Sequence, residues 1–204
     1  RLLDQGLFAD LVAAARQAPR RRLHRNFHPD DAYPAHRLLI AIEPDSYVPP
    51  HRHLNPNKDE TLLVLRGSLG VVFFDAAGKV ERHAILRAGG ETLGVDIPHG
   101  VFHTVCALET ATVFFEAKAG PYVPVSAEEK APWVPAEGEA AVADYLAGLR
   151  QACLGWLQLA RAGHPATVVA TNDLVAGVSD ADAVLVQLRV GGQATRNDDE
   201  TWPH

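Results

Sequence analysis

The stretch HRHLNPNKDETLLVLRG, residues 51–67, decides the fold of this chain together with IPHGVFH, residues 97–103. The two stretches supply three imidazoles and one carboxylate, a set that suits a divalent first-row transition metal. Alternate residues of a β-strand point to one face, about 6.6 Å apart, so an HxH pair can close on a single ion. The predicted metal ligands are His51, His53, Glu60 and His103.

The two stretches resemble the two cupin motifs, which read HxH, a spacer, Glu and a later Gly, followed by PxGxxH. In this chain the first motif ends at Gly67, and the second runs from Pro98 through Gly100 to its histidine. Cupins are small double-sheet jelly rolls, so the resemblance implies a mainly β protein. The expected fold is a cupin double-stranded β-helix, or jelly-roll barrel, with the metal inside it, an N-terminal helix and a C-terminal helical extension.

Two departures from the motifs bear on the expected site. Six residues separate His53 from Glu60, where the usual spacer has three or four, which predicts a longer turn through LNPNKD. Ala107 stands where an Asn often follows the last histidine of the motif, so one group that would orient a ligand is missing.

Within the cupins the chain resembles the WbuC-type cupin metalloproteins. That resemblance implies a metal-binding cupin associated with bacterial surface-polysaccharide biosynthesis, a family without a settled reaction. The matching pieces fall in the order of the family over roughly the first 150 residues. They are PRRRLHRNFH (19–28), SYVPPHRH (46–53), LRGSLGVVFFD (65–75), FFEAKAGPYVP (114–124) and APWVP (131–135).

The composition is typical of a globular protein, with 204 residues, 47% hydrophobic and 22% charged, and a net charge of −6. No nucleic-acid partner is expected, because a phosphate-binding surface needs concentrated Lys and Arg. No membrane partner is expected either, since no apolar run approaches the roughly 18 to 20 residues of a membrane span. Cys106 and Cys153 are predicted to be small buried hydrophobes in a reducing, cytoplasmic protein.

The chain divides into four parts by pattern. Residues 1–34 are predicted to hold an N-terminal helix, which Pro19 stops, and a lid segment. Residues 35–124 form the barrel, and residues 125–163 form a Pro-rich connection and a C-terminal helix. Residues 164–204 are an extension whose structure the pattern leaves open. It could add strands to the barrel edge, mediate dimerisation, or have no specific role.

Seven short runs rich in Val, Ile, Leu and Phe predict the barrel strands, with turn signals such as RGS and DAAG between them. An eighth strand is expected at residues 46–48. The seven runs are residues 36–43, 60–66, 69–74, 79–86, 91–97, 101–108 and 111–118.

Several further side chains are candidates for the cavity. Asn26 and His28 match the N-terminal piece of the family and are expected to cover the barrel mouth, although a histidine before Pro29 is also a common turn residue. Glu116 and Lys118 share a strand face, as a buried acid–base pair or as an exposed ion pair. The basic run that includes Arg22 is either a solvated stretch or a site for an anionic group. The predicted substrate-binding residues are Arg22, Asn26, His28, Lys58, Glu116 and Tyr122.

Two functional hypotheses follow from these residues. The first is a metal-dependent enzyme that isomerises, epimerises or oxidises a small polar molecule, sugar-related or carboxylated, with Fe, Mn, Ni or Zn as the ion. The second is a non-catalytic barrel that captures such a molecule through the metal. A titratable group outside the ligand set but within reach of a bound molecule would favour the enzyme. The catalytic residues stay open, the expected partner is a small-molecule ligand, and a homodimer through sheet edges is expected.

Overall fold

The computed structural model describes residues 2–161, with side chains described as far as residue 154. These residues lie in one compact unit, Arg1–Ala170. The predictions for the extension from residue 164 onward lie outside the described residues.

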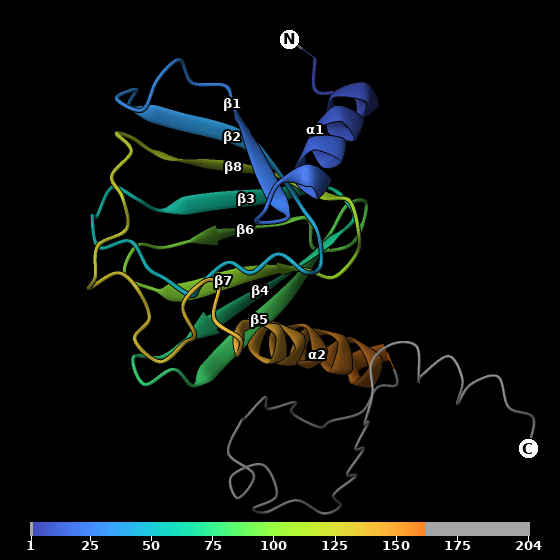
Figure 1. Cartoon of the computed structure of the whole chain (residues 1–204), viewed down its shortest axis with the longest axis vertical. Helices are drawn as coiled ribbons and strands as arrows, with labels where there is room; N and C mark the ends of the chain where they lie inside the picture. Colours follow the sequence, from blue (N-terminus) through green and yellow to red (C-terminus); the bar gives the residue numbers. More distant parts are fainter. Residues whose placement is uncertain (1, 162–204) are drawn as a thin grey trace, which may run out of the picture. The chain divides into compact units, whose positions relative to one another are not determined.

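Two antiparallel sheets face each other and form the barrel (Figure 1). The larger sheet has the strand order β1-β2-β8-β3-β6, and the smaller one has the order β5-β4-β7. This mainly β architecture of two facing antiparallel sheets is the jelly roll that the two motifs predict. The strands are β1 (Arg22–Asn26), β2 (Ala35–Ile42), β3 (Glu60–Arg66), β4 (Ser68–Phe74), β5 (Val80–Arg87), β6 (Gly94–Ile97), β7 (Phe102–Ala107) and β8 (Thr112–Ala119).

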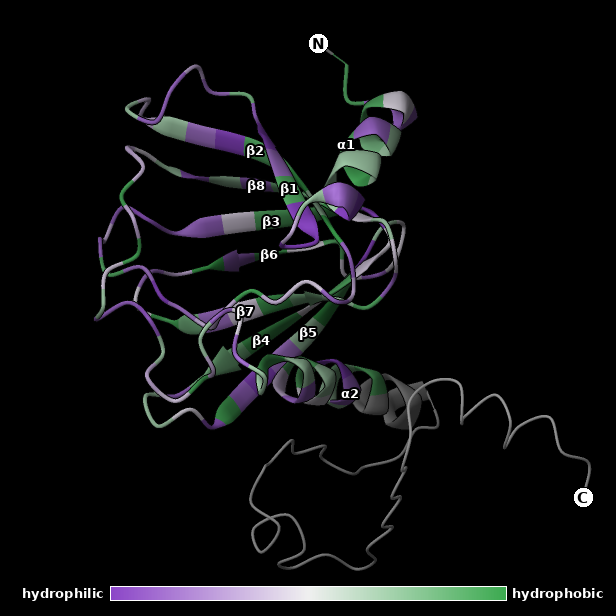
Figure 2. Ribbon diagram, in the orientation of Figure 1, coloured by the Kyte–Doolittle hydropathy of each residue, from purple (hydrophilic) through white to green (hydrophobic). Residues whose placement is uncertain are grey.

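The central strand of the smaller sheet is buried on both faces. All seven residues of β4 are buried, and the strand is apolar along most of its length (Figure 2). Leu69, Val71 and Phe73 point into the barrel core, while Val72 and Phe74 point outward, because successive side chains of a strand alternate. A strand that is apolar on both faces needs a cover on its outer side.

One helix covers the outer face of each sheet (Figure 1). Helix α1 (Gln5–Gln17) begins at Asp4, whose side chain accepts a 2.9 Å hydrogen bond from the Leu7 amide as an N-cap. Its buried side chains pack on Leu39 and other outward residues of the larger sheet. Helix α2 (Val142–Arg161) packs its apolar stripe on the outer face of β4 and β7.

Gly67 makes the sharp turn from β3 to β4 possible. Its φ is +76°, a left-handed conformation that L side chains rarely adopt. A Cβ atom at this position would lie 2.6 Å from Thr112 Oγ1 of β8. The glycine of the first motif is therefore required both by the backbone and by the neighbouring strand.

The prediction of a strand at residues 46–48 is wrong, since no strand forms there within the part of the chain that the structure describes. Pro44, Pro49 and Pro50 lack the amide hydrogens that a sheet edge would need. The eighth strand is instead β1, in the basic run that was expected to be a solvated stretch or an anion site. The run predicted at residues 91–97 is shorter than expected, because only its last four residues join the sheet as β6.

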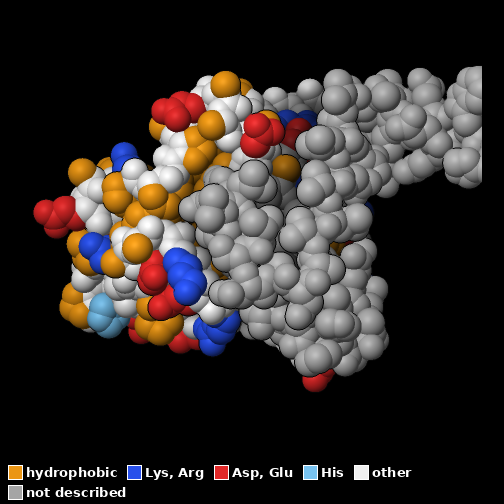
Figure 3. Space-filling model, turned by 90° about the horizontal axis from the view of Figure 1, so that it is seen from below, with side chains coloured by type: hydrophobic (Ala, Val, Ile, Leu, Met, Phe, Trp, Pro, Cys, Tyr) orange, Lys and Arg blue, Asp and Glu red, His pale blue; other side chains and the backbone are white. Residues whose placement is uncertain are grey.

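The outer surface gives two simple findings. Figure 3 views the molecule from below, where charged side chains of both signs lie among apolar ones on the described part. Within residues 2–161, every helix falls short of the length and apolar character that crossing a membrane would require.

Candidate metal centre

The four predicted ligands converge on one point inside the barrel. One nitrogen of each histidine and one oxygen of Glu60 all lie within 4.8 Å of one another. Ligands held about 2.1 Å from an ion lie about 3 Å apart at right angles and about 4.2 Å apart when opposite. The group therefore fits a single transition-metal ion after small side-chain adjustments.

The backbone joins the two halves of the ligand set. Glu60 is the first residue of β3 in the larger sheet, and His103 lies on β7 in the smaller sheet. His51 pairs with His103 as an isolated bridge, with amide-to-carbonyl distances of 3.0 and 2.8 Å. Because this bridge ties the HxH segment to β7, the site draws ligands from both sheets.

Two of the imidazoles are oriented by backbone carbonyls. The Nδ1–H of His51 donates to the Pro49 carbonyl at 3.0 Å, and the Nδ1–H of His103 donates to the Val101 carbonyl at 2.9 Å. This tautomer leaves Nε2 of His51 unprotonated and able to bind an ion. Nε2 of His103 faces Glu60 and would give up its proton when an ion binds. Metal-binding histidines are commonly held in this way through the second ring nitrogen.

Glu60 lies at the centre of the group. Its Oε1 is 2.9 Å from Nε2 of His53, and its Oε2 is 3.2 Å from Nε2 of His103. Burial alone would raise the pKa of Glu60, but the hydrogen bonds from the two histidines and the charge of Lys118 hold it well below its usual value. Burial lowers the pKa of His51 to about 4. At neutral pH the group thus contains an ionised carboxylate beside a neutral imidazole, the forms that bind metals.

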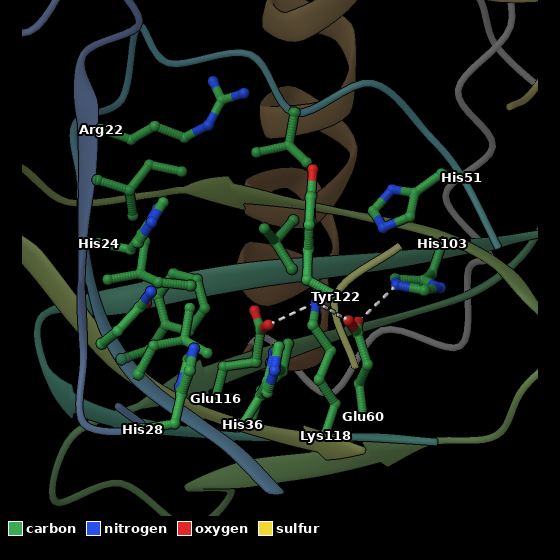
Figure 4. A pocket seen from close by; sticks show the side chains of 18 of the residues that line it. Arg22, His24, His28, His36, His51, Glu60, His103, Glu116, Lys118 and Tyr122 are labelled. Atoms are coloured by element: carbon green, nitrogen blue, oxygen red, sulfur yellow. Dashed lines mark hydrogen bonds and ion pairs between the residues drawn. The ribbon is translucent and has the colours of Figure 1, made fainter. Parts of the chain in front are cut away.

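Three of the four predicted ligands, His51, Glu60 and His103, lie in the wall of a cavity of about 480 Å³ inside the barrel (Figure 4). Its lining follows the two-residue period of the strands, because alternate side chains of β1, β2, β3, β7 and β8 point inward. Its floor is apolar, with Leu38, Ile40, Ile42, Val48, Leu62, Val105 and Phe114. Its remaining lining is polar and includes Arg22, His24, Asn26, His28, Asp31, His36, Glu116, Lys118 and Tyr122.

Lys118 connects the ligand group to a second carboxylate. Its ammonium lies 2.6 Å from Oε1 of Glu60 and 2.7 Å from Oε1 of Glu116, as the dashed lines in Figure 4 show. Of the two arrangements considered for Glu116 and Lys118, the structure has the largely buried pair. Burial raises the pKa of Glu116, and the charge of Lys118 offsets only part of this effect. Burial opposes the charged form of Lys118, yet the two carboxylates raise its pKa.

The structure brings five of the six predicted substrate-binding residues to the cavity: Arg22, Asn26, His28, Glu116 and Tyr122. Lys58 is not among the lining residues. Its buried ammonium donates a 2.9 Å hydrogen bond to the Pro121 carbonyl, so it holds the segment that precedes Tyr122. Arg22 is partly engaged, because it donates to the Tyr47 carbonyl at 2.8 Å and pairs with Glu137 at 3.1 Å.

Two lining histidines, His24 and His36, were missed in the sequence. The ring of His36 stacks on that of His28, with centroids 4.0 Å apart and an interplanar angle of 3°. The signal for His24 was its place two residues from both Arg22 and Asn26, which puts the three side chains on one face of β1. His99 of the second motif lies outside the cavity and bonds to Asp59 at 2.8 Å.

A family model matches the N-terminal part of the chain. Residues 3–86 match a family model described as DUF6016, a domain of unknown function. No curated protein matches the chain at a significant level.

The chain also matches several solved structures over about half of its length. KdgF from Halomonas sp. is 16% identical, with 50% of this chain and 81% of that chain covered and a TM-score of 0.40. A cupin-2 domain protein from Shewanella frigidimarina is 21% identical, with 48% and 80% covered and a TM-score of 0.37. A recombinant oxalate oxidase in complex with glycolate is 19% identical, with 52% and 55% covered and a TM-score of 0.40.

Proposed function

We propose that this protein is a metal-dependent cupin that acts on a small polar molecule, carboxylated or sugar-related, inside its barrel. The observation that carries the proposal is the convergence of three imidazoles on Glu60, with two of their outer nitrogens held by backbone carbonyls. An Fe, Mn, Ni or Zn ion would be held by His51, His53, Glu60 and His103. When bound, such an ion supplies a Lewis acid with open positions for oxygen ligands.

The size and lining of the cavity favour a small ligand whose polar groups lie on one side. In the sheet register His36 is opposite Lys118, and Lys118 is opposite Glu60, so the three residues form one row across β2, β8 and β3. Two strand spacings put the backbones at the ends of this row about 10 Å apart. A molecule of a few carbon atoms that binds at the metal end can therefore reach the histidines at the other end, over an apolar floor.

Glu116 favours an enzyme over a simple binding protein. It lies outside the ligand set, lines the cavity, and its pKa is raised by burial, which suits a group that gives and takes a proton. Lys118 holds its carboxylate at 2.7 Å and fixes its orientation. We assign Glu116 as the proton-transfer group of an isomerase or epimerase reaction.

We also propose that the chain is of the WbuC type, that it is cytoplasmic, and that it forms a homodimer.

The test of the metal site is elemental analysis of the full chain purified without added metal. We expect near-stoichiometric iron, manganese, nickel or zinc in the wild type, and its loss in the His51→Ala, His103→Ala double variant. The His99→Ala variant is the matched control, since His99 is in the second motif but outside the cavity. Negligible metal in all three folded proteins, persisting after reconstitution with each ion, would overturn the proposal.

The test of catalysis uses a panel of hydroxy acids, keto acids and uronic acids followed by NMR. We expect one class to show conversion by the metal-loaded wild type. The Glu116→Gln variant should still broaden the ligand signals through binding but should lose at least about 100-fold in rate, as general acid–base catalysis predicts. Equal rates in both proteins would remove Glu116 from the reaction, and binding without conversion across the panel would favour the non-catalytic hypothesis.

A further inference from the structure

Two cysteines from different layers of the molecule meet beneath α2. Cys106 lies on β7 and points away from the cavity, and Cys153 lies on the inward face of α2. Both are fully buried, and they are the two cysteines of the whole chain. As the sequence predicts, they are buried among apolar side chains, but the prediction did not place them together.

A glycine makes room for the two sulfur atoms. Gly70 of β4 is the cross-strand partner of Cys106. A Cβ atom on Gly70 would lie 2.9 Å from Sγ of Cys153 and 3.1 Å from Sγ of Cys106. The notch left by this glycine therefore holds both sulfurs, and any larger residue would displace them.

The two thiols differ in chemical character. The interaction with the neighbouring Cys106 thiol lowers the pKa of Cys153. The same interaction, together with burial, raises the pKa of Cys106. Because the thiolate is the form that reacts with oxidants, Cys153 is the more reactive sulfur of the pair.

We propose that Cys106 and Cys153 form an oxidisable dithiol, a modification site that a peroxide converts to an intramolecular disulfide between β7 and α2. The Cys153 thiolate attacks one oxygen of the peroxide, the O–O bond breaks, and Cys153 becomes a sulfenic acid. The Cys106 sulfur then attacks the Cys153 sulfur, the S–O bond breaks, and the oxygen leaves as water. Two thiols lose two electrons and two protons, and hydrogen peroxide is reduced to two waters.

The disulfide would tie α2 to the strand that holds a predicted metal ligand, because Cys106 is on β7 with His103. Closing the long loop between the two cysteines restricts the unfolded chain, and disulfides of this length stabilise folded proteins. Under reducing conditions the pair would stay as thiols and α2 would be held by packing alone. The site thus responds to the oxidant level and is independent of the proposed metal function.

The experiment treats the full chain, purified under reducing conditions, with hydrogen peroxide, both as purified and after EDTA treatment to suppress metal-catalysed oxidation. We expect free thiols under denaturing conditions to fall from two to none, with a loss of two hydrogen atoms in the intact mass. Non-reduced peptide mapping should join the Cys106 peptide to the Cys153 peptide. The thermal midpoint should rise by roughly 5 °C and should return after dithiothreitol.

Single-cysteine variants test the order of the two steps. Cys106→Ser leaves Cys153 without its resolving partner, so a sulfenic acid trapped by dimedone should accumulate there. In the Cys153→Ser variant, less dimedone-trapped sulfenic acid should form at Cys106, because Cys106 is the less reactive sulfur. If a variant does not fold, the wild-type peptide map decides by itself. Two thiols that stay free in folded protein, that oxidise separately to sulfinic acids, or that cross-link different chains would overturn the proposal.

Discussion

Two groups of histidines lie in the same cavity, and they differ in what their ring nitrogens bind. In the group around Glu60, Nδ1 of His51 and of His103 donates to a backbone carbonyl, so Nε2 is the ring nitrogen that each histidine can offer to an ion. In the other group, Nδ1 of His28 accepts the Arg37 amide at 3.2 Å, and Nε2 of His36 faces the Asp31 carbonyl.

Within residues 2–161, the ring hydrogen bonds of the second group are to backbone atoms and not to a carboxylate, and its ring geometry is different. Its rings stack in parallel at 4.0 Å, whereas the rings of His51 and His103 are tilted by 50° with centroids 4.7 Å apart. Parallel stacked rings direct their nitrogens past each other and not toward a shared ion. A cavity histidine is suited to bind a metal when a hydrogen bond at one ring nitrogen orients the other, and when a carboxylate lies nearby.

Lys118 lies between the two groups, and its removal gives the largest expected effect. In the metal-free protein its ammonium compensates Glu60 and Glu116, so Lys118→Met leaves two buried carboxylates without a counter-charge. We expect the free energy of unfolding to fall by about 3 kcal/mol in urea titrations of metal-free protein. A saturating divalent ion should restore part of the loss, because it supplies positive charge at Glu60.

Lys79→Met is the matched control, since Lys79 is exposed on the turn before β5. We expect its effect to stay within about 0.5 kcal/mol. Equal destabilisation by the two substitutions would mean that Lys118 contributes no more than a surface lysine.

Glu60 and Glu116 allow a sharper comparison, because both pair with Lys118 and only Glu60 is surrounded by histidines. Glu60→Gln should weaken metal binding at least about 100-fold, or roughly 2.7 kcal/mol, through loss of an anionic ligand. Glu116→Gln makes the same change of charge and should alter the metal affinity by less than about threefold. Competition titrations with a metal indicator measure both, and similar losses would mean that charge alone, and not ligation, attracts the ion.

The sequence predicted the metal end of the cavity better than the other end. The motif residues have fixed spacings along two short stretches, and both glycine turns lie within them, so local pattern sufficed. The barrel strands followed from short apolar runs, and most of their observed bounds lie close to the predicted ones.

The failures at the other end have a physical cause. In β1 the inward side chains, Arg22, His24 and Asn26, are polar because they face the polar part of the cavity. The usual alternation of apolar inward residues is therefore reversed, and the strand resembles a solvated stretch. The row that joins His36 to Lys118 depends on strand register, which a single sequence does not specify.

The pH dependence of stability tests the metal end without a metal. Because the pKa of His51 is about 4 in the folded protein and about 6.5 in an unfolded chain, protons favour the unfolded state. The folded protein keeps His51 neutral, and the stability associated with this neutral form is fully present above pH 6.5. This stability is lost as the pH falls toward 4. We expect about 2 kcal/mol of it to disappear between pH 7 and pH 5.

Two other histidines of the cavity shift in the same direction, so the measurement is a difference between two proteins. Burial also lowers the pKa of His24 and of His36. Urea titrations at several pH values should show a smaller loss on acidification for metal-free His51→Gln than for the wild type. Parallel curves for the two proteins would show that His51 titrates at the same pH in the folded and unfolded chains.

The smallest effect is expected for the stacked rings of His28 and His36. Their removal tests whether only the histidines around Glu60 hold the ion. The His28→Ala, His36→Ala double variant removes two imidazoles from the cavity, as the ligand double variant does. Since neither ring contacts Glu60, we expect the metal content to stay within about 20% of the wild type and the stability to fall by about 1 kcal/mol. Ligand affinity should fall more than metal affinity, because the pair lines the far end of the cavity. Metal loss equal to that of the ligand variant would show that the second group also holds the ion, and the distinction drawn from the ring nitrogens would fail.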